Sequence, residues 1–322
     1  MISTKRTAAS IIRWMVAGCV ALVLASPGWA DAQSRFSGIV VFGTSLSDPG
    51  NAFALAGGSA TPPDFLLNPF LIPSVPYAKG GHHFSDGATW VEQFGRSIGL
   101  GQSVRPAFAD PNATNYAVGA ARAYDDGVNF NLRRQVDMFL ERSGNVAPFQ
   151  ALYVIEMGSN DIRDAFALYA TGGNGGPILV QAIGSIVANI QRLYAAGARE
   201  FLVWLPPNVG LTPAIRSLPP AAQALAGQVT QIFDGNLAGA LTQLSANLPG
   251  TSFARLDAYQ LLNAIVANPP AFNLANVTAA CLTPNVAPFT CHDVDEFLFW
   301  DGIHPTKAGH AIVADEAAKT VQ

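Results

Sequence analysis

Ser45, Asp301 and His304 are the residues of this sequence whose types best suit nucleophilic catalysis. A serine hydroxyl is a weak nucleophile until a general base takes its proton, and that base is often a histidine that a carboxylate orients. Asp301 and His304 are three residues apart, which is about one helical turn, so their side chains can project to the same side. The sequence therefore offers a nucleophile, a base and an acid that orients the base.

Ser45 directly follows a segment that is typical of a buried strand. The run that begins near Gly38 and stops at Gly43 is rich in β-branched and aromatic side chains, and the polar residues 44–51 favour a turn and a helix N-cap. Ligands bind at the carboxyl ends of strands in open α/β sheets, so a serine delivered there is placed to react. Taken alone, the same serine would also be typical of an N-cap.

Three other segments carry polar or glycine-containing turns where a strand or a late loop ends. They are residues 119–121 after the apolar residues 115–118, residues 158–161 after the buried strand 151–157, and the loop 300–305 that holds Asp301 and His304. Because parallel strands bring their carboxyl ends to one edge of a sheet, we expect these turns to meet Ser45 there.

Alternating strands and helices fill the rest of the chain. We expect strands at 201–205 and 252–256, and helices at 88–98, 132–140, 177–196, 221–244, 259–266 and 306–318. Such alternation predicts an α/β fold, a three-layer α/β/α sandwich around a central, mostly parallel sheet of about five strands. We expect one domain over residues 33–322, with a long irregular excursion at 51–86 over the active edge.

The four turn segments, in their order along the chain, resemble the conserved blocks of the GDSL/SGNH hydrolase family. The flanking residues 84–92, 115–120 and 297–306 are similar to the larger bacterial GDSL esterase/lipase branch of that family. The resemblance runs over essentially the whole chain after residue 32. It implies the SGNH-hydrolase fold, which is flavodoxin-like.

The same resemblance implies a secreted serine esterase or lipase that hydrolyses carboxylic esters through an acyl-enzyme. Ser45 would be the nucleophile, His304 the general base, and Asp301 the residue that holds His304. The N–H groups of Ser45 and Gly119 and the side-chain amide of Asn160 would form the oxyanion hole. The resemblance implies no metal ion and no organic cofactor.

Two positions depart from the pattern of the family. Thr44 stands where the signature has an aspartate between the glycine and the serine. That aspartate is not the acid of the triad, so we expect the change to alter the hydrogen bonds of the loop rather than to remove the partner of His304. Ala120 follows Gly119 where the second block often has another glycine, which changes the shape of the pocket there.

Other functions fit the same residues. An acyltransferase or a carbohydrate deacetylase would use the same intermediate, because water and another alcohol compete for it. A surface binding or adhesion protein would keep the fold without the chemistry. For the enzyme we expect a small-molecule ester or lipid substrate, at most peripheral contact with a membrane, and a monomer.

The composition excludes two further classes of protein. Of the 322 residues, 50% are hydrophobic and 12% are charged, half of the roughly 25% that is usual, which is unlike a disordered chain. The net charge is −4, and removal of a leader with Lys5, Arg6 and Arg13 leaves 15 basic against 22 acidic residues, or −7. A mildly acidic chain without basic runs is a poor binder of nucleic acid.

Residues 1–30 have the pattern of a signal peptide. Basic residues precede the apolar run 14–25, which ends at a Pro-Gly break and small residues, and we expect cleavage after Ala30 or Ala32. The protein would then be exported to the periplasm or to the cell exterior. The alternatives are a lipoprotein, because residues 16–19 resemble a lipoprotein box that ends at Cys19, and a retained membrane anchor.

Cys281 and Cys291 are the cysteines that remain after such cleavage. Their even number, their close spacing and an exported setting favour a disulfide. Zinc is the alternative, since His292 follows Cys291, but the two cysteines lack the CxxC spacing of zinc sites. The adjacent His82 and His83 lack a repeated acidic partner and predict no metal site.

Several other polar and apolar residues have structural interpretations. We expect Asp48 and Asp161 to be loop and cap residues, and His310 to be packed or hydrogen-bonded on the last helix. The apolar residues of the excursion either pack as a lid over the sheet edge or line a groove for an acyl chain. This apolar set includes Phe65, Leu67 and Phe70.

Overall fold

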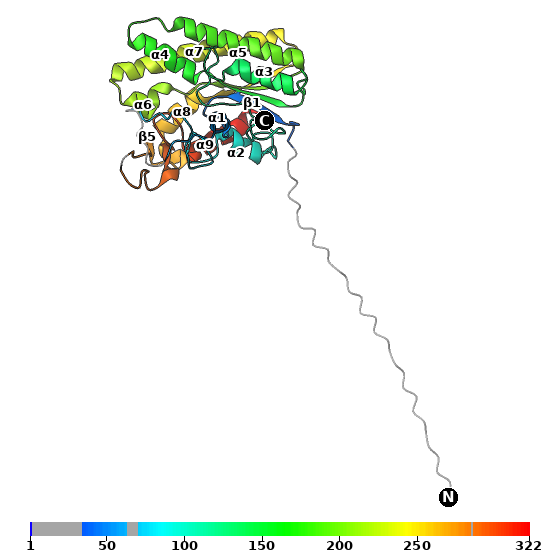
Figure 1. Cartoon of the computed structure of the whole chain (residues 1–322), viewed down its shortest axis with the longest axis horizontal. Helices are drawn as coiled ribbons and strands as arrows, with labels where there is room; N and C mark the ends of the chain where they lie inside the picture. Colours follow the sequence, from blue (N-terminus) through cyan, green and yellow to red (C-terminus); the bar gives the residue numbers. More distant parts are fainter. Residues whose placement is uncertain (2–33, 63–69, 285) are drawn as a thin grey trace. The chain divides into compact units, whose positions relative to one another are not determined.

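A sheet of four parallel strands lies at the centre of the fold (Figure 1). The computed structural model describes residues 1, 34–62, 70–284 and 286–322, so the predicted signal peptide after its first residue, with Cys19, lies outside the described residues. Residues 33–322 form one compact unit. In it β1 (Ile39–Gly43), β2 (Leu152–Glu156), β3 (Glu200–Leu205) and β4 (Ser252–Asp257) pair side by side in that order, and every pairing is parallel. The predicted α/β class is confirmed.

A fifth segment extends this sheet beyond β1 without becoming a regular strand. We predicted a strand at 115–118, and the structure instead has an irregular segment with an isolated bridge between Val41 and Asn115. Backbone bonds join it to β1: the Val41 N–H donates to the Thr114 carbonyl at 2.9 Å, and the Val118 N–H donates to the Gly43 carbonyl at 3.1 Å. The sheet therefore has four regular strands and a fifth position that is irregular.

The strands build two separate cores, one on each face of the sheet. In β1 the side chains of Val40 and Phe42 enter one core, and those of Ile39 and Val41 enter the other. All residues of β1 and β2 are buried. A parallel sheet with helices on both faces has no solvent-exposed side, which explains why these strands are continuous apolar runs in the sequence.

Helices cover both faces of the sheet (Figure 1). One face carries α3 (Leu132–Arg142), α4 (Ser159–Ala170), α5 (Gly176–Ala196) and α7 (Pro220–Asn247). The other carries α2 (Trp90–Ser97), α8 (Ala258–Ala267) and α9 (Lys307–Thr320). Each helix that periodicity predicted is present, with ends shifted by at most three residues. The sequence prediction missed α4, because its first turn reads as a polar turn after β2.

Shorter elements complete the part of the chain that the structure describes. The excursion that we predicted to be irregular begins with the helix α1 (Asn51–Leu55) and contains an isolated bridge between Thr61 and Tyr77. A second, two-stranded parallel sheet consists of β5 (Asn276–Ala280) and β6 (Phe297–Phe299). The others are η1 (Val209–Leu211), α6 (Pro213–Arg216), η2 (Pro269–Phe272) and η3 (Val294–Glu296).

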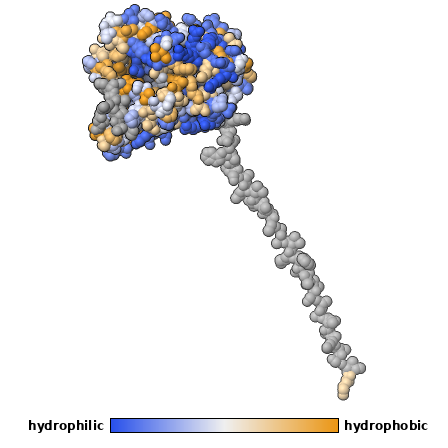
Figure 2. Space-filling model, viewed as in Figure 1, coloured by the Kyte–Doolittle hydropathy of each residue, from blue (hydrophilic) through white to orange (hydrophobic). Residues whose placement is uncertain are grey.

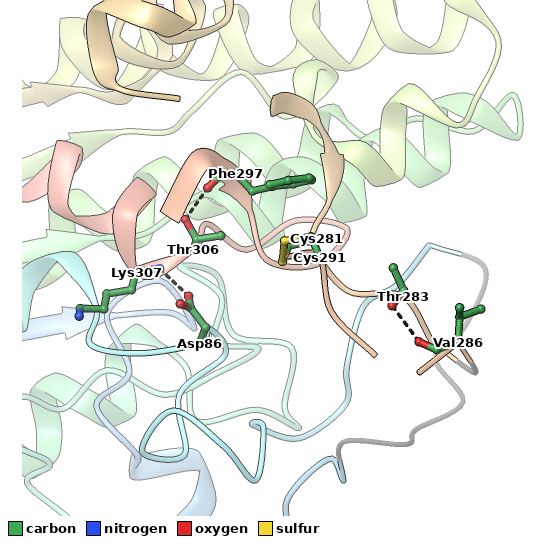
Figure 3. Close-up of a disulfide and its surroundings, with 8 residues drawn as sticks. All are labelled: Asp86, Cys281, Thr283, Val286, Cys291, Phe297, Thr306 and Lys307. Atoms are coloured by element: carbon green, nitrogen blue, oxygen red, sulfur yellow. Dashed lines mark hydrogen bonds between the residues drawn. A yellow bond between two sulfur atoms is a disulfide. The ribbon is translucent and has the colours of Figure 1, made fainter. Parts of the chain in front are cut away.

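The predicted disulfide joins Cys281 to Cys291 in the segment between β5 and β6 (Figure 3). This bond leaves neither thiolate for the zinc alternative. The Cys281 N–H donates to the Phe299 carbonyl at 2.9 Å, and the Leu282 N–H donates to the Trp300 carbonyl at 3.0 Å. The disulfide therefore closes a loop that is hydrogen-bonded to the residues just before Asp301.

Among the described helices, α5 is the one that is long and apolar enough to cross a membrane by length and composition. Its residues Leu179, Ile186 and Leu193 are buried in the core beside the sheet, as is usual for a core helix of an α/β protein. Figure 2 shows hydrophobic and hydrophilic residues interspersed on the visible face of the molecule. Exposed apolar side chains that are dispersed in this way are ordinary.

Asp234 on α7 is a buried carboxyl group, and neither of its oxygens has a hydrogen-bond partner among the described residues. Burial, together with the charge of Asp257, raises the pKa of Asp234 to about 8. A carboxyl group with a higher pKa in the folded state binds its proton more tightly when folded. Its contribution to stability is complete at low pH and is lost as the pH rises toward the folded pKa.

We expect the variant Asp234→Asn to gain stability relative to the wild type as the pH rises from about 5 to about 8. The amide keeps the shape of the carboxyl group but cannot ionise, so the difference in free energy of unfolding should grow by up to about 1.4 kcal/mol per pH unit. Denaturant unfolding of both proteins across this range measures the difference. A difference that does not change with pH would contradict the raised pKa of Asp234.

Candidate active site

Ser45, His304 and Asp301 lie in hydrogen-bonding contact, although Ser45 and His304 are 259 positions apart. His304 Nε2 is 2.9 Å from Ser45 Oγ, and His304 Nδ1 is 2.6 Å from Asp301 Oδ2. With the proton on Nδ1, the imidazole donates to Asp301 and can accept the hydroxyl proton of Ser45 at Nε2. All three residues are buried. The arrangement is suited to nucleophilic attack by Ser45.

The loop that carries Asp301 and His304 is fixed at both ends. It connects β6 to α9, and the Trp300 N–H donates to the His304 carbonyl at 2.8 Å. Thr306 is the N-cap of α9: its Oγ1 accepts the Gly309 N–H at 3.0 Å and donates to the Phe297 carbonyl at 2.6 Å (Figure 3). The cap therefore joins the start of the helix to β6 and sets the position of the loop between them.

Asp301 receives four hydrogen bonds from the described residues, one of which comes from the excursion. Its Oδ1 accepts the backbone N–H groups of Ile303 and His304 at 2.8 and 2.7 Å. Its Oδ2 accepts His304 Nδ1 and also the hydroxyl of Tyr77, at 2.7 Å. Burial and the charge of Asp301 raise the pKa of the Tyr77 phenol, so Tyr77 acts as a donor.

The excursion also packs directly against the backbone of the same loop. The Gly302 N–H donates to the Leu71 carbonyl at 2.9 Å. A Cβ atom on residue 302 would lie 1.7 Å from the carbonyl oxygen of Phe70. Only glycine fits there, so the residue between Asp301 and Ile303 is determined by this close approach of the two backbones.

Asn160, in the first turn of α4, lies beside Ser45 and His304 in the same cavity. Its Nδ2 donates to the Ala121 carbonyl at 2.9 Å, and its Oδ1 accepts from Arg163 Nη1 at 3.0 Å. These two bonds fix the amide and leave one of its two N–H groups available. The Ser45 N–H likewise has no acceptor within the described residues. Both groups are therefore available to an oxyanion.

Asp48 acts as the predicted loop and cap residue, and it also engages Gly119. Its carboxylate accepts N–H groups from residues 50–52 at the start of α1. It also accepts the Gly119 N–H at 2.8 Å, so that N–H is not free for an oxyanion. Burial raises the pKa of Asp48 to about 6, although these bonds oppose the shift. The next N–H, that of Ala120, has no acceptor in the part of the chain described.

Ala120 adopts a left-handed conformation, with φ of 64°. This conformation costs an L-residue of ordinary size roughly 1–2 kcal/mol, whereas glycine adopts it freely. The departure that we noted in the sequence is therefore a residue that accepts backbone strain beside the site.

A cavity of about 330 Å³ opens beside Ser45 and His304. One wall is polar and includes Asn160 and Arg163. Most of the remaining wall is apolar and comes from the excursion, from α4 and from the segment after β3. The apolar lining residues are Leu46, Phe70, Ile72, Phe166, Ala167, Pro207, Val209, Ala214, Ile215, Leu218 and Ile303.

The other histidines and carboxylates singled out in the sequence have structural roles. His82 stacks on Phe53, with ring centroids 3.6 Å apart. His310 is buried, and burial lowers its pKa to about 3, so it is packed as a neutral ring. Asp161 lies in the first turn of α4 rather than in a loop, and it accepts the N–H groups of residues 123 and 124. Within the described residues no group of three or more potential ligands is placed to hold a metal ion.

The description "GDSL-like Lipase/Acylhydrolase" belongs to the family model that matches residues 39–317 of this chain. The chain belongs to this family. It is a carboxylic ester hydrolase, since the relatives that match it over most of its length are named as esterases and lipases.

The chain is similar to curated relatives from a plant and a bacterium and to a solved structure. The chain is 24% identical to a GDSL esterase/lipase of Arabidopsis thaliana over 90% of each protein. It is 29% identical to the esterase EstA of Pseudomonas aeruginosa over 94% of this chain and 49% of EstA, so it spans about half the length of that relative. The crystal structure of an extracellular lipase from Streptomyces rimosus matches 87% of this chain and 98% of that one, with 14% identity and a TM-score of 0.39.

For this GDSL-family chain, the sequence prediction named residues that the structure brings together and missed others that support them. Ser45, Asn160 and His304 line one cavity, and Asp301 is hydrogen-bonded to His304. The Gly119 N–H is hydrogen-bonded to Asp48 instead. The contact of Tyr77 with Asp301 could not be predicted from the sequence, because the two residues are 224 positions apart and Tyr77 lies in a stretch without periodicity. Glu156 could have been found from the sequence, because it is a charged residue at the end of an otherwise apolar strand.

We expect Tyr77→Phe to lower kcat by roughly tenfold and to leave KM nearly unchanged, because it removes one hydrogen bond from the carboxylate that orients His304. Steady-state kinetics on a nitrophenyl ester measure both constants. The matched control is Tyr153→Phe, since Tyr153 is also buried and its hydroxyl donates to the Pro148 carbonyl at 2.9 Å, in the core. Equal kcat losses in the two variants would show that Tyr77 has no specific role.

Proposed function

We propose that this protein is an exported serine esterase or lipase that hydrolyses carboxylic esters through an acyl-enzyme on Ser45. The observation that carries the proposal is the continuous hydrogen-bonded path from Ser45 Oγ through the imidazole of His304 to Asp301. Membership of the GDSL family supports the same chemistry.

In the first half of the reaction Ser45 Oγ attacks the carbonyl carbon of the ester. Its proton passes to His304 Nε2, and Asp301 stabilises the imidazolium that forms. The ester C–O bond then breaks, and the leaving alkoxide takes the proton from Nε2 to depart as the alcohol. Water repeats the sequence on the acyl-enzyme and releases the carboxylic acid, which regenerates Ser45.

The oxyanion of each tetrahedral intermediate accepts hydrogen bonds from the Ser45 N–H and the Asn160 amide. Both donors have a hydrogen available and lie beside the nucleophile. Because the Gly119 N–H is engaged by Asp48, the third donor in this proposal is the N–H of Ala120. A donor of this kind contributes roughly 3–4 kcal/mol to the transition state.

The cavity beside Ser45 is the site for the acyl chain in this proposal. Its lining is mainly apolar. A water-sized group occupies roughly 30 Å³, so the cavity volume of about 330 Å³ accommodates about ten methylene-sized groups. Medium-chain acyl esters are therefore the preferred substrates. Phe70 lines the cavity, which supports the acyl-groove interpretation of the excursion, whereas Phe65 and Leu67 lie outside the described residues.

Export, the leader cleavage after Ala30 or Ala32, and a monomeric state belong to the same proposal. The disulfide between Cys281 and Cys291 supports an oxidising compartment. A nitrophenyl ester or a lipid ester is a suitable substrate, and contact with a membrane would be peripheral.

We expect Ser45→Ala to lower kcat for nitrophenyl octanoate by at least about a thousandfold, because the variant retains the oxyanion donors but lacks the nucleophile. Steady-state hydrolysis measures the loss, and circular dichroism confirms the fold.

The control is Ser185→Ala on α5, outside the cavity. Equal activity of Ser45→Ala and the wild type would exclude the proposed nucleophile, and an inactive wild type would favour a binding protein. Product analysis with added glycerol or sterol distinguishes hydrolysis from acyl transfer.

We expect Ala167→Phe to lower kcat/KM for decanoyl esters by roughly tenfold while sparing acetyl and butyryl esters. The larger side chain would occupy part of the cavity and displace about two methylene groups, each worth about 0.8 kcal/mol when buried. A panel of esters of graded acyl length measures the profile. Leu168→Phe is the control, because Leu168 is exposed on the same helix and does not line the cavity. Identical profiles for both variants would rule out this site for the acyl chain.

A further inference from the structure

Glu156 is a buried carboxylate that lies directly against the turn of the nucleophile. It is the last residue of β2, and the parallel register places it opposite Gly43, the last residue of β1. Its side chain is fully buried. One oxygen would lie 3.0 Å from a Cβ atom on residue 43, so the carboxylate fills the space where β1 turns toward Ser45.

The Glu156 carboxylate is hydrogen-bonded to Thr44, just before Ser45, and to Ser47, two residues after it. It accepts the Thr44 N–H at 2.8 Å, and the Thr44 hydroxyl lies 3.0 Å from each carboxylate oxygen. The Ser47 side chain is a further hydrogen-bond partner. Ser47 Oγ in turn accepts the indole N–H of the fully buried Trp90 at 3.0 Å. The turn that presents Ser45 is therefore tied to the sheet through one carboxylate.

No cation pairs with Glu156 among the described residues. Burial raises the pKa of Glu156 to about 7, against the opposing effect of its hydrogen bonds. The carboxylate is thus stabilised only by N–H and O–H donors. A second carboxyl group at position 44 would face Glu156 at hydrogen-bonding distance in a buried site, where the two groups could not both ionise, which is unfavourable.

The four letters that name the family stand for Gly-Asp-Ser-Leu, whereas residues 43–46 of this chain read Gly-Thr-Ser-Leu. We propose that Thr44 and Glu156 are a matched pair, in which Glu156 supplies from the neighbouring strand the carboxylate that the signature places at position 44. Glu156 is thereby a positioning residue for Ser45. This inference rests on the proposed function in that it takes Ser45 as the nucleophile.

The test is a double-mutant cycle with Thr44→Asp, Glu156→Thr and the combined variant, which exchanges the two residue types. We expect Thr44→Asp alone to lower kcat by at least about a hundredfold and Glu156→Thr alone by about tenfold or more, with KM within about twofold in each. The combined variant should recover kcat to within about tenfold of the wild type.

Two independent measurements accompany the kinetics. The rate at which a fluorophosphonate labels Ser45 reports the reactivity of the nucleophile in the folded fraction, and the midpoint of denaturant unfolding reports stability. We expect labelling to fall and recover with kcat. If Thr44→Asp does not fold, its recovery as a folded, labelled protein on addition of Glu156→Thr supports the same inference.

The control variants are Thr230→Val and Asp234→Asn. They change a buried threonine and a buried carboxyl group on α7 that do not contact the turn of Ser45, and both should keep the wild-type kcat. Losses of kcat that simply add in the combined variant would overturn the matched pair. Loss of stability without loss of labelling rate would overturn the positioning role. Absence of both hydrolysis and labelling in the wild type would instead contradict the proposed function, and the stability cycle would still decide whether the residues are matched.

Discussion

The parallel pairing of β1 with β2 is the interaction on which the rest of the site depends. Its register sets Gly43 opposite Glu156, so both strands end at the same level. The turn with Ser45 and the start of α4 with Asn160 therefore leave the sheet side by side. A slip of one residue would turn every side chain of β1 to the opposite core and move Ser45 away from Asn160.

Buried carboxylates hold the loops of the site in place, each through several N–H or O–H donors. Glu156 ties the turn of Ser45 to the sheet, Asp48 joins α1 to Gly119, and Asp301 joins the loop of His304 to the excursion through Tyr77. A carboxylate accepts several hydrogen bonds at once and so can fix loops that have no regular structure of their own.

Local patterns predicted what local physics determines. The apolar strands, the long helices and the residues Ser45, Asp301 and His304 could all be predicted, because each sits in a short, distinctive segment. Gly119 and Tyr77 show the limit. Whether an N–H is free, or which phenol reaches a carboxylate, depends on contacts between distant segments that no window of sequence contains. The part of the cavity lining that lies outside the excursion was missed for the same reason, since Phe166 and Ile215 come from separate elements.

The separation of Ser45 and His304 along the sequence bears on the reactivity of the unfolded chain. The bond between them joins residues 259 positions apart, and His304 lies just before α9. In the proposed mechanism, a chain that has not yet folded holds Ser45 apart from its general base. Under the proposed function, Ser45 therefore becomes reactive only once the segment that carries Asp301 and His304 has docked beside it.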